Sequence, residues 1–218
     1  MAQTFPPITN TLARVSVLGF VFLVGGTLWL LSAVFGSPYV SGAGLTQPQP
    51  VAFNHRTHVG GLGLDCRFCH AFVEESATAG LPPTKTCMAC HSQILADSSL
   101  LAQVRDSYAT DVPIPWTRVH DLEDFVRFDH SIHVAQGVGC SSCHGQVDQT
   151  PLVAQGASLQ MSWCLACHRH PEPFLRARED VFDPQWLRPA DQELRGAHYL
   201  TERSIRPSVL SDCSLCHQ

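Results

Sequence analysis

Every cysteine of this 218-residue chain belongs to a motif in which two cysteines, separated by two residues, are followed directly by histidine. The ten cysteines form five such CxxCH motifs. The motifs are Cys66, Cys69 and His70; Cys87, Cys90 and His91; Cys140, Cys143 and His144; Cys164, Cys167 and His168; and Cys213, Cys216 and His217. This spacing is typical of haem c attachment, in which both thiols bond to the haem and the adjacent histidine ligates its iron.

Two other uses of paired cysteines fit this pattern less well. A disulfide framework gives no reason for a histidine after each pair. Structural zinc combines CxxC units in twos to reach four ligands, so five identical units would leave one without a partner. The sequence therefore predicts five haem c groups, with the five motif histidines as proximal ligands.

The sixth coordination position of such an iron is filled in electron-transfer haems by a second histidine or a methionine. Two His-x-x-His units each lie just before a CxxCH motif, in the stretches VAFNHRTHVGGLGLDCRFCH and VRFDHSIHVAQGVGCSSCH. They supply His55, His58, His130 and His133. We expect the first histidine of each unit to ligate the haem attached just downstream, and the second to ligate a different haem.

The fifth distal ligand has two candidates. His120 lies in PWTRVHDLEDFVRFDH and Met161 lies in LQMSWCLACH, both close to haem-binding segments. A methionine thioether would raise the potential of its haem. The residues alone leave the choice open. His170, two residues beyond a proximal ligand, and His198 are expected at the surface or in support of a ligand.

An apolar stretch near the N-terminus indicates a membrane anchor. Residues 15–35, VSVLGFVFLVGGTLWLLSAVF, contain no charge. They are long enough to cross about 30 Å of hydrocarbon as a helix, and longer than the roughly 7–15 apolar residues of a secretory signal. We expect an uncleaved single-pass helix. Because Arg14 is its nearest basic residue, residues 1–14 should be a cytoplasmic tail, with the rest on the periplasmic face of a bacterial cytoplasmic membrane.

The remainder shows an internal repeat. Residues 36–50 are rich in Gly, Pro and Ser and are expected to form a linker to a haem domain at 51–218. Within it, the pattern F-[ND]-H-x-x-H-V followed by two CxxCH motifs occurs at 51–91 and again at 126–168. The repeat predicts two copies of a two-haem module, followed by a single haem at 213–217.

Five haems in so short a domain leave little room for an ordinary core. The porphyrins, packed against aromatics such as Phe53, Phe68, Phe128 and Trp163, should serve as the core. We expect a multihaem cytochrome c fold of short α-helices and irregular loops with very little β-structure. The apolar spacing after Ser92 predicts a helix over residues 92–109, ended by the prolines of DVPIPW.

Catalysis at a haem is not expected. All five motifs end in histidine, and spare histidines are available to close the irons, so a reductase of small oxyanions would lack an open coordination site. The net charge of −5 comes without a basic stripe, so nucleic acid is not expected as a partner. The sequence favours an electron-transfer protein with no catalytic residue of its own.

The repeated units look like those of low-potential trihaem and tetrahaem cytochromes. The fuller pattern, with an N-terminal anchor, RVHDLEDFVRFDHSIHV, MSWCLACHR and five CxxCH motifs, resembles the pentahaem subunit of alternative complex III, a bacterial quinol oxidoreductase. The resemblance spans residues 51–217. It implies electrons received from an iron–sulfur subunit, supplied by integral membrane quinol-oxidising subunits, and passed to a monohaem cytochrome c subunit or a soluble acceptor.

The alternative is a free-standing membrane cytochrome that oxidises quinol directly and supplies an exported reductase. Such a protein needs a polar residue near the bilayer to take the quinol proton. Residues 36–50 contain no acid, histidine or lysine, which counts against this alternative.

Overall fold

The computed structural model describes residues 5–217, in two compact units bounded as Met1–Gly42 and Ala43–Gln218. Residues 1–4 of the expected tail, and residue 218, lie outside the described residues. The division falls inside the segment expected to be a linker.

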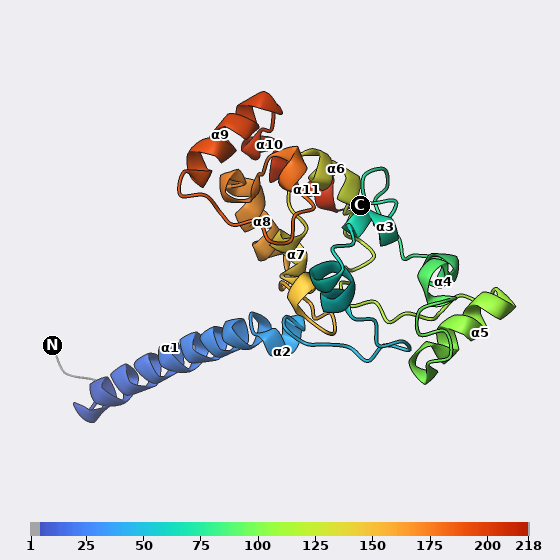
Figure 1. Ribbon diagram of the computed structural model, residues 1–218. Coiled ribbons are helices and arrows are strands. Elements are labelled where there is room, and N and C mark those ends of the chain that lie inside the picture. The colour runs from blue at the N-terminus through green and yellow to red at the C-terminus, as the bar shows by residue number, and fades with distance from the viewer. Residues whose placement is uncertain (1–4, 218) are drawn as a thin grey trace. The chain divides into compact units, whose positions relative to one another are not determined.

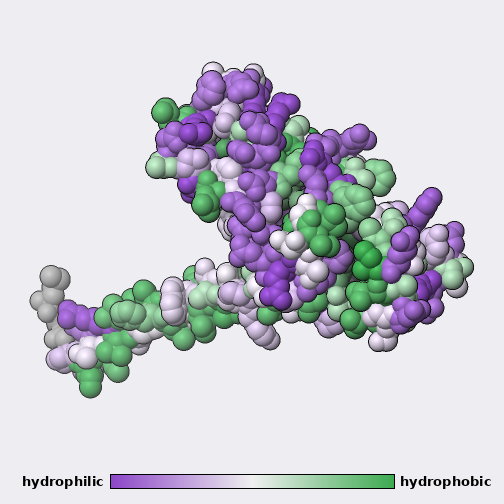
Figure 2. All heavy atoms as spheres, in the orientation of Figure 1, coloured by the Kyte–Doolittle hydropathy of each residue, from purple (hydrophilic) through white to green (hydrophobic). Residues whose placement is uncertain are grey.

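The first unit consists of α1 (Ile8–Phe35) and the short α2 (Pro38–Ser41) (Figure 1). The helix begins directly after two prolines, ahead of residue 15, because residues 8–14 contain no helix breaker. None of its side chains is buried, and Figure 2 shows apolar residues along its length. Among residues 5–217 it is the one helix long and apolar enough to cross a membrane.

The second unit contains short helices joined by irregular chain, and residues 5–217 include no β-strand. The α-helices are α3 (Cys66–Cys69), α4 (Thr84–His91), α5 (Ala102–Thr110), α6 (His130–Ala135), α7 (Ser141–His144), α8 (Met161–Arg169), α9 (Gln192–Glu202), α10 (Pro207–Leu210) and α11 (Cys213–Cys216). Single turns of other helix types are η1 (Arg56–Gly61), η2 (Ser99–Leu101), η3 (Val147–Gln149), η4 (Glu172–Phe174) and η5 (Arg178–Asp180). The expected short helices with very little β-structure are confirmed.

Part of the expected linker is bonded into the second unit. The Gly44 N–H donates to the Gln155 carbonyl at 2.7 Å, and Thr46 forms an isolated antiparallel bridge with Ala154. The Gln49 amide both donates to the carbonyl and accepts from the N–H of Thr117. Residues 44–49 are therefore fixed to the second unit by backbone and amide hydrogen bonds.

The helix expected over residues 92–109 is only partly present. Residues 92–98 form turns, with Leu95 at a φ of 57°, and helical structure begins after Ser98, whose hydroxyl caps η2. The turns carry the Ile94 carbonyl to His91, whose Nδ1 lies 2.9 Å away. This hydrogen bond to a motif histidine overrides the helical spacing of the apolar residues.

The apolar core of the second unit is small. Its buried apolar side chains are Val51, Val73, Val104, Ile114, Leu175 and Val181. Three of them, Val51, Val104 and Ile114, cluster with the partly buried Met88 and Trp116. Many larger apolar side chains remain exposed, including Phe72 at 58% and Leu62 at 68%.

Residues 171–203 are bound to the second repeat by hydrogen bonds from two arginine side chains. The buried Arg176 lies over the Trp186 ring at 4.1 Å and donates to the Ser141 hydroxyl at 2.7 Å. Arg203 donates to the carbonyls of Gln136 and Arg176. These bonds tie the segment to Gln136, just before the motif that begins at Cys140, and to Ser141 within that motif.

The packing of α9 on η4 yields the first prediction. A methyl group on Gly196 would overlap the Glu172 carbonyl, whereas one on Gly25 of α1 would meet nothing within 4 Å. We expect Gly196→Ala to lower the unfolding free energy of the second unit by about 1–3 kcal/mol through overpacking. Urea unfolding followed by circular dichroism measures it, with Gly25→Ala as the control. Equal stability of the two variants would contradict this packing.

Candidate functional site

A polar side chain just ahead of each His-x-x-His unit accepts from the backbone of the helical turn that follows. In the first, the Asn54 side chain accepts from the Thr57 N–H at 3.1 Å. In the second, the Asp129 carboxylate accepts from the N–H groups of Ser131 and Ile132 and caps α6. A short polar residue before each unit thus stabilises the first turn that carries its histidines.

A phenylalanine ahead of each unit orients both histidines. Phe53 stacks on His58 with ring centroids 4.4 Å apart and meets His55 edge-on at 4.8 Å. In the second unit, Phe128 stacks on His133 at 4.6 Å and meets His130 edge-on at 4.8 Å. The two histidines of each unit therefore present their rings at a large angle to each other.

Six imidazole rings are held by a hydrogen bond from Nδ1 to a backbone carbonyl. The pairs are His58 with Asn54, His70 with Gly80, His91 with Ile94, His130 with Ala77, His133 with Asp129, and His168 with Leu210, at 2.7–3.0 Å. A carbonyl can only accept, so Nδ1 carries the proton in each neutral ring and Nε2 keeps a free lone pair. This is the form in which histidine binds a metal through Nε2.

Three histidine pairs have the separation that one iron would require. The ring centroids of His58 and His91 are 6.1 Å apart, those of His130 and His144 6.2 Å, and those of His133 and His168 6.1 Å. Two metal–nitrogen bonds of about 2 Å, extended by each imidazole radius, separate two ring centres by about 6 Å. Each pair thus joins a motif histidine to a histidine of a His-x-x-His unit.

Burial keeps the remaining central histidines neutral. Burial, together with the nearby His70 and His58, lowers the pKa of His55 to about 4. Burial, with His120 and His130 close by, lowers the pKa of His144 to about 3. The buried His55 Nδ1 has no hydrogen-bond partner in the described part of the chain, unlike its counterpart in His130. Neutral imidazoles are the metal-binding form.

The two candidates for a fifth distal ligand lie in different surroundings. His120 lies 4.3 Å from the His144 ring, and its Nε2 accepts from the Gly156 N–H at 3.2 Å. Met161 is the first residue of α8 and is 63% exposed. The His217 ring stacks on Phe125 at 5.9 Å. The structure therefore places His120 against the motif at 140–144.

The two other histidines lie at the surface. His198 is exposed and faces Glu202 at 3.8 Å, one turn further along α9. His170 follows the end of α8 and is exposed. The surface position expected for both is in agreement with the structure.

The cysteines stand free on short helices. All ten are unpaired, and Asp65 and Asp212 cap the helices that begin at Cys66 and Cys213. Burial raises the pKa of Cys143 and of Cys167 to about 11. Without disulfides, each CxxC pair keeps both of its thiols available for attachment to a haem.

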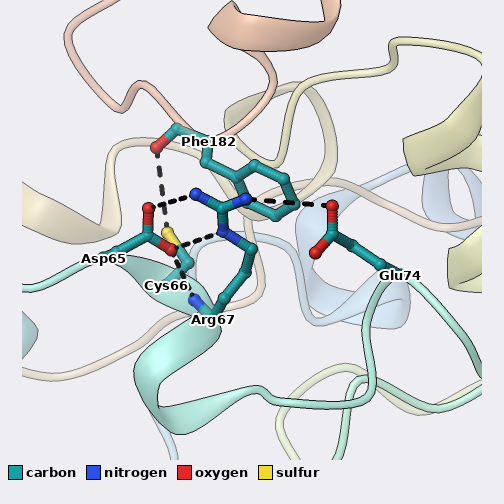
Figure 3. A network of polar contacts seen from close by, with 5 residues as sticks. All are labelled: Asp65, Cys66, Arg67, Glu74 and Phe182. Carbon is teal, nitrogen blue, oxygen red and sulfur yellow. Dashed lines mark hydrogen bonds and ion pairs between the residues drawn. The ribbon is translucent and has the colours of Figure 1, made fainter.

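A polar network surrounds the first motif. Arg67 pairs with Asp65 at 2.8 Å, lies over the Phe182 ring at 4.3 Å and faces Glu74 at 3.8 Å (Figure 3). The Cys66 thiol donates to the Phe182 carbonyl at 3.9 Å. Exposed ion pairs of this kind contribute little stability, so the network chiefly positions the motif.

The residues fit haem c. The free thiols, the imidazoles oriented through Nδ1, the ring separations and the uncovered apolar side chains each match a need of a covalently bound, doubly ligated haem. The sequence could not identify the carbonyl acceptors, since any residue type supplies a carbonyl. One signal existed for Gly80, whose φ of 80° favours glycine, ahead of two prolines.

Comparison with known proteins supports this chemistry. Residues 126–218, the second repeat and the final motif, match the family of cytochrome c7 and related cytochromes c. The multihaem cytochrome c subunit of the menaquinone reductase of Nitratidesulfovibrio vulgaris is 28% identical over 173 residues, covering 78% of this chain and 67% of that protein. The similarities support a membrane-associated multihaem cytochrome c.

The ring pairs predict the effect of removing one distal histidine. If His58 and His91 share an iron, His58→Ala opens one coordination position, and a high-spin ferric EPR signal should appear for one haem. His198→Ala, which removes an exposed imidazole, is the matched control and should leave the spectrum unchanged. An unchanged low-spin spectrum in a correctly loaded His58→Ala protein would rule out the pairing.

Proposed function

We propose that the chain is the electron-transfer subunit of a membrane quinone oxidoreductase complex and holds five haems c. The observation that carries the proposal is the set of histidine pairs with centroids 6.1–6.2 Å apart, each containing a histidine that follows a CxxC pair. When bound, a haem supplies reversible one-electron redox chemistry at its iron.

The residues have distinct tasks in this proposal. The ten cysteines attach the haems, and His70, His91, His144, His168 and His217 are the proximal ligands. The distal partners are His55 for His70, His58 for His91, His130 for His144 and His133 for His168. The pairing of His55 with His70 rests on the electrostatic interaction between these two histidines. The other three pairings rest on ring separations. For His217, His120 and Met161 both stay candidates.

The same residues exclude small-molecule chemistry at the paired sites. A histidine on both sides of an iron leaves no position for a substrate, so no catalytic residue is assigned. Where a carbonyl accepts from Nδ1, as it does for six of the rings, it would hold the ring in one tautomer and orientation before and after electron transfer. The chain would thus pass electrons without transforming a substrate itself.

The place of this subunit in a complex rests on resemblance. The relative from Nitratidesulfovibrio vulgaris is a subunit of a menaquinone reductase, and the motif pattern resembles the pentahaem subunit of alternative complex III. We propose integral membrane quinone-reactive subunits and an iron–sulfur subunit as partners, and a monohaem cytochrome c subunit or soluble acceptor at the other end. Helix α1 would anchor the chain in the lipid of the cytoplasmic membrane, with the haem domain in the periplasm.

The direction of flow has two candidates. The resemblance to alternative complex III favours electrons leaving quinol, whereas the name of the menaquinone reductase favours electrons entering the quinone pool. A membrane preparation in which the haems are reduced by quinol in the presence of an acceptor inhibitor supports the first. Haem oxidation by added quinone supports the second.

Haem content is the first test of the proposal. Five intact CxxCH motifs should give five haems per chain in a pyridine haemochrome assay, with the mass of the protein raised accordingly. Cys213→Ala with Cys216→Ala should remove one haem. Four or fewer haems in the wild-type protein would contradict the proposed set of attachment sites.

Quinol reactivity is the second test. The isolated chain should exchange electrons with small mediators but should not oxidise quinol above background. A single helix forms no pocket, and the hydroxyls of Ser16, Thr27 and Ser32 are its polar side chains within residues 15–35; none titrates near neutral pH. Inhibitor-sensitive quinol oxidation by the pure, partner-free protein would instead favour the free-standing cytochrome that oxidises quinol directly.

A further inference from the structure

The first and third CxxCH motifs meet in space. The Cys66 thiol donates to the Phe182 carbonyl, and the Cys140 N–H donates to the neighbouring Val181 carbonyl at 3.2 Å. The interaction of the two neighbouring thiols lowers the pKa of Cys66 and raises that of Cys140. Two motifs far apart in the chain are thus held at the same turn of residues 181–182 (Figure 3 shows the Cys66 side).

The two repeats also exchange backbone hydrogen bonds at this junction. The Arg56 N–H of the first repeat donates to the Thr150 carbonyl of the second, at 3.2 Å. The Ser131 N–H of the second repeat donates to the Ser76 carbonyl of the first, at 3.3 Å. Thr150 and Ser76 occupy equivalent positions, each the same number of residues after the proximal histidine of its own repeat. The contact is therefore reciprocal. The motifs at 66–70 and 140–144 are central neighbours.

The second motif lies beyond the first. His58, from the unit that precedes the first motif, pairs with His91 of the second at 6.1 Å. Helix α4 also packs on α5, which carries no motif, through the hydrogen bond between Thr84 and Ser107 and the contact of Met88 with the cluster that contains Val104. The second motif therefore lies at one end of the series of attachment sites.

The fourth and fifth motifs continue from the third. His133, which precedes the third motif, pairs with His168 of the fourth at 6.1 Å. The His168 Nδ1 donates to the carbonyl of Leu210, just before Cys213. Burial, followed by the nearby Cys216 thiol, raises the pKa of Cys164. The fifth motif thus adjoins the fourth.

Exposure agrees with this arrangement. Cys90 and Cys213 are exposed, while the other eight cysteines are partly buried. The two exposed cysteines belong to the second and fifth motifs, the ends found from the contacts.

We propose that the five attachment sites are arranged in space in the order second, first, third, fourth, fifth, so that the motifs at 87–91 and 213–217 are the two ends. The proposal rests on the proposed haem attachment. The sites at the junction of the repeats, at 66–70 and 140–144, are internal to the series.

A matched pair of variants tests the order. Deleting an attachment site by Cys66→Ala with Cys69→Ala should shift the midpoint potentials of two remaining haems, because the first site has two neighbours. Deleting the second site by Cys87→Ala with Cys90→Ala should shift only one. Redox titration followed by EPR, which resolves the individual low-spin haems, gives the readout. The opposite result, with two shifts for the second site and one for the first, is what an order along the chain requires and would overturn the proposal.

A measurement on the unaltered protein covers the case in which a variant fails to fold. In an experimental structure of the wild-type holoprotein, the haems on Cys66 and Cys140 should be nearest neighbours, and those on Cys87 and Cys140 should not touch. Direct contact between the latter two, or a disulfide between Cys66 and Cys140, would overturn the order. Haem content is counted separately, so fewer than five haems would count against the proposed function, while the order is judged on the haems present.

Discussion

The hydrogen bond from imidazole Nδ1 to a backbone carbonyl is the interaction on which this structure depends. It fixes the tautomer and the direction of the ring, and it leaves Nε2 available. Much of the irregular chain exists to deliver those carbonyls. The turns after His91 bring the Ile94 oxygen back to that ring, and the segment before Cys213 brings the Leu210 oxygen to His168. In a regular helix these carbonyl oxygens would instead accept hydrogen bonds from backbone N–H groups of the same helix.

A second constraint is the shortage of apolar side chains inside the protein. The described part of the second unit buries six apolar residues well, while Phe68, Phe72 and Leu62 remain largely exposed. Each Å² of buried apolar surface stabilises the fold by about 25 cal/mol. With so little apolar surface buried, this gain cannot offset the conformational entropy lost when so many residues become ordered. Flat apolar groups inserted between the histidine pairs would supply the missing burial, so haem attachment would stabilise the folded chain.

Much of the site followed from residue types at fixed spacing. The CxxCH motifs, the paired histidines and the phenylalanine ahead of each pair recur in both repeats, and the local geometry of the repeats agrees to within a few tenths of an ångström in ring separation. Contacts between the repeats were not predictable, because they are made by backbone groups that any residue supplies. The same limit hid the attachment of residues 44–49 to the second unit, and the turn at Leu95 that interrupts a well-spaced apolar pattern.

The reciprocal hydrogen bonds between the repeats have a bearing on the origin of the chain. Arg56 reaches Thr150 in the same way that Ser131 reaches Ser76, so each repeat offers the same donor and receives at the same acceptor. That is the geometry of an isologous contact, which is otherwise made by two identical subunits about a two-fold axis. In these two hydrogen bonds the repeats are related as the halves of a symmetric dimer would be, and here the segment that contains α5 connects them. A tandem duplication that fused such a dimer would have kept its interface and gained a single, permanently paired chain.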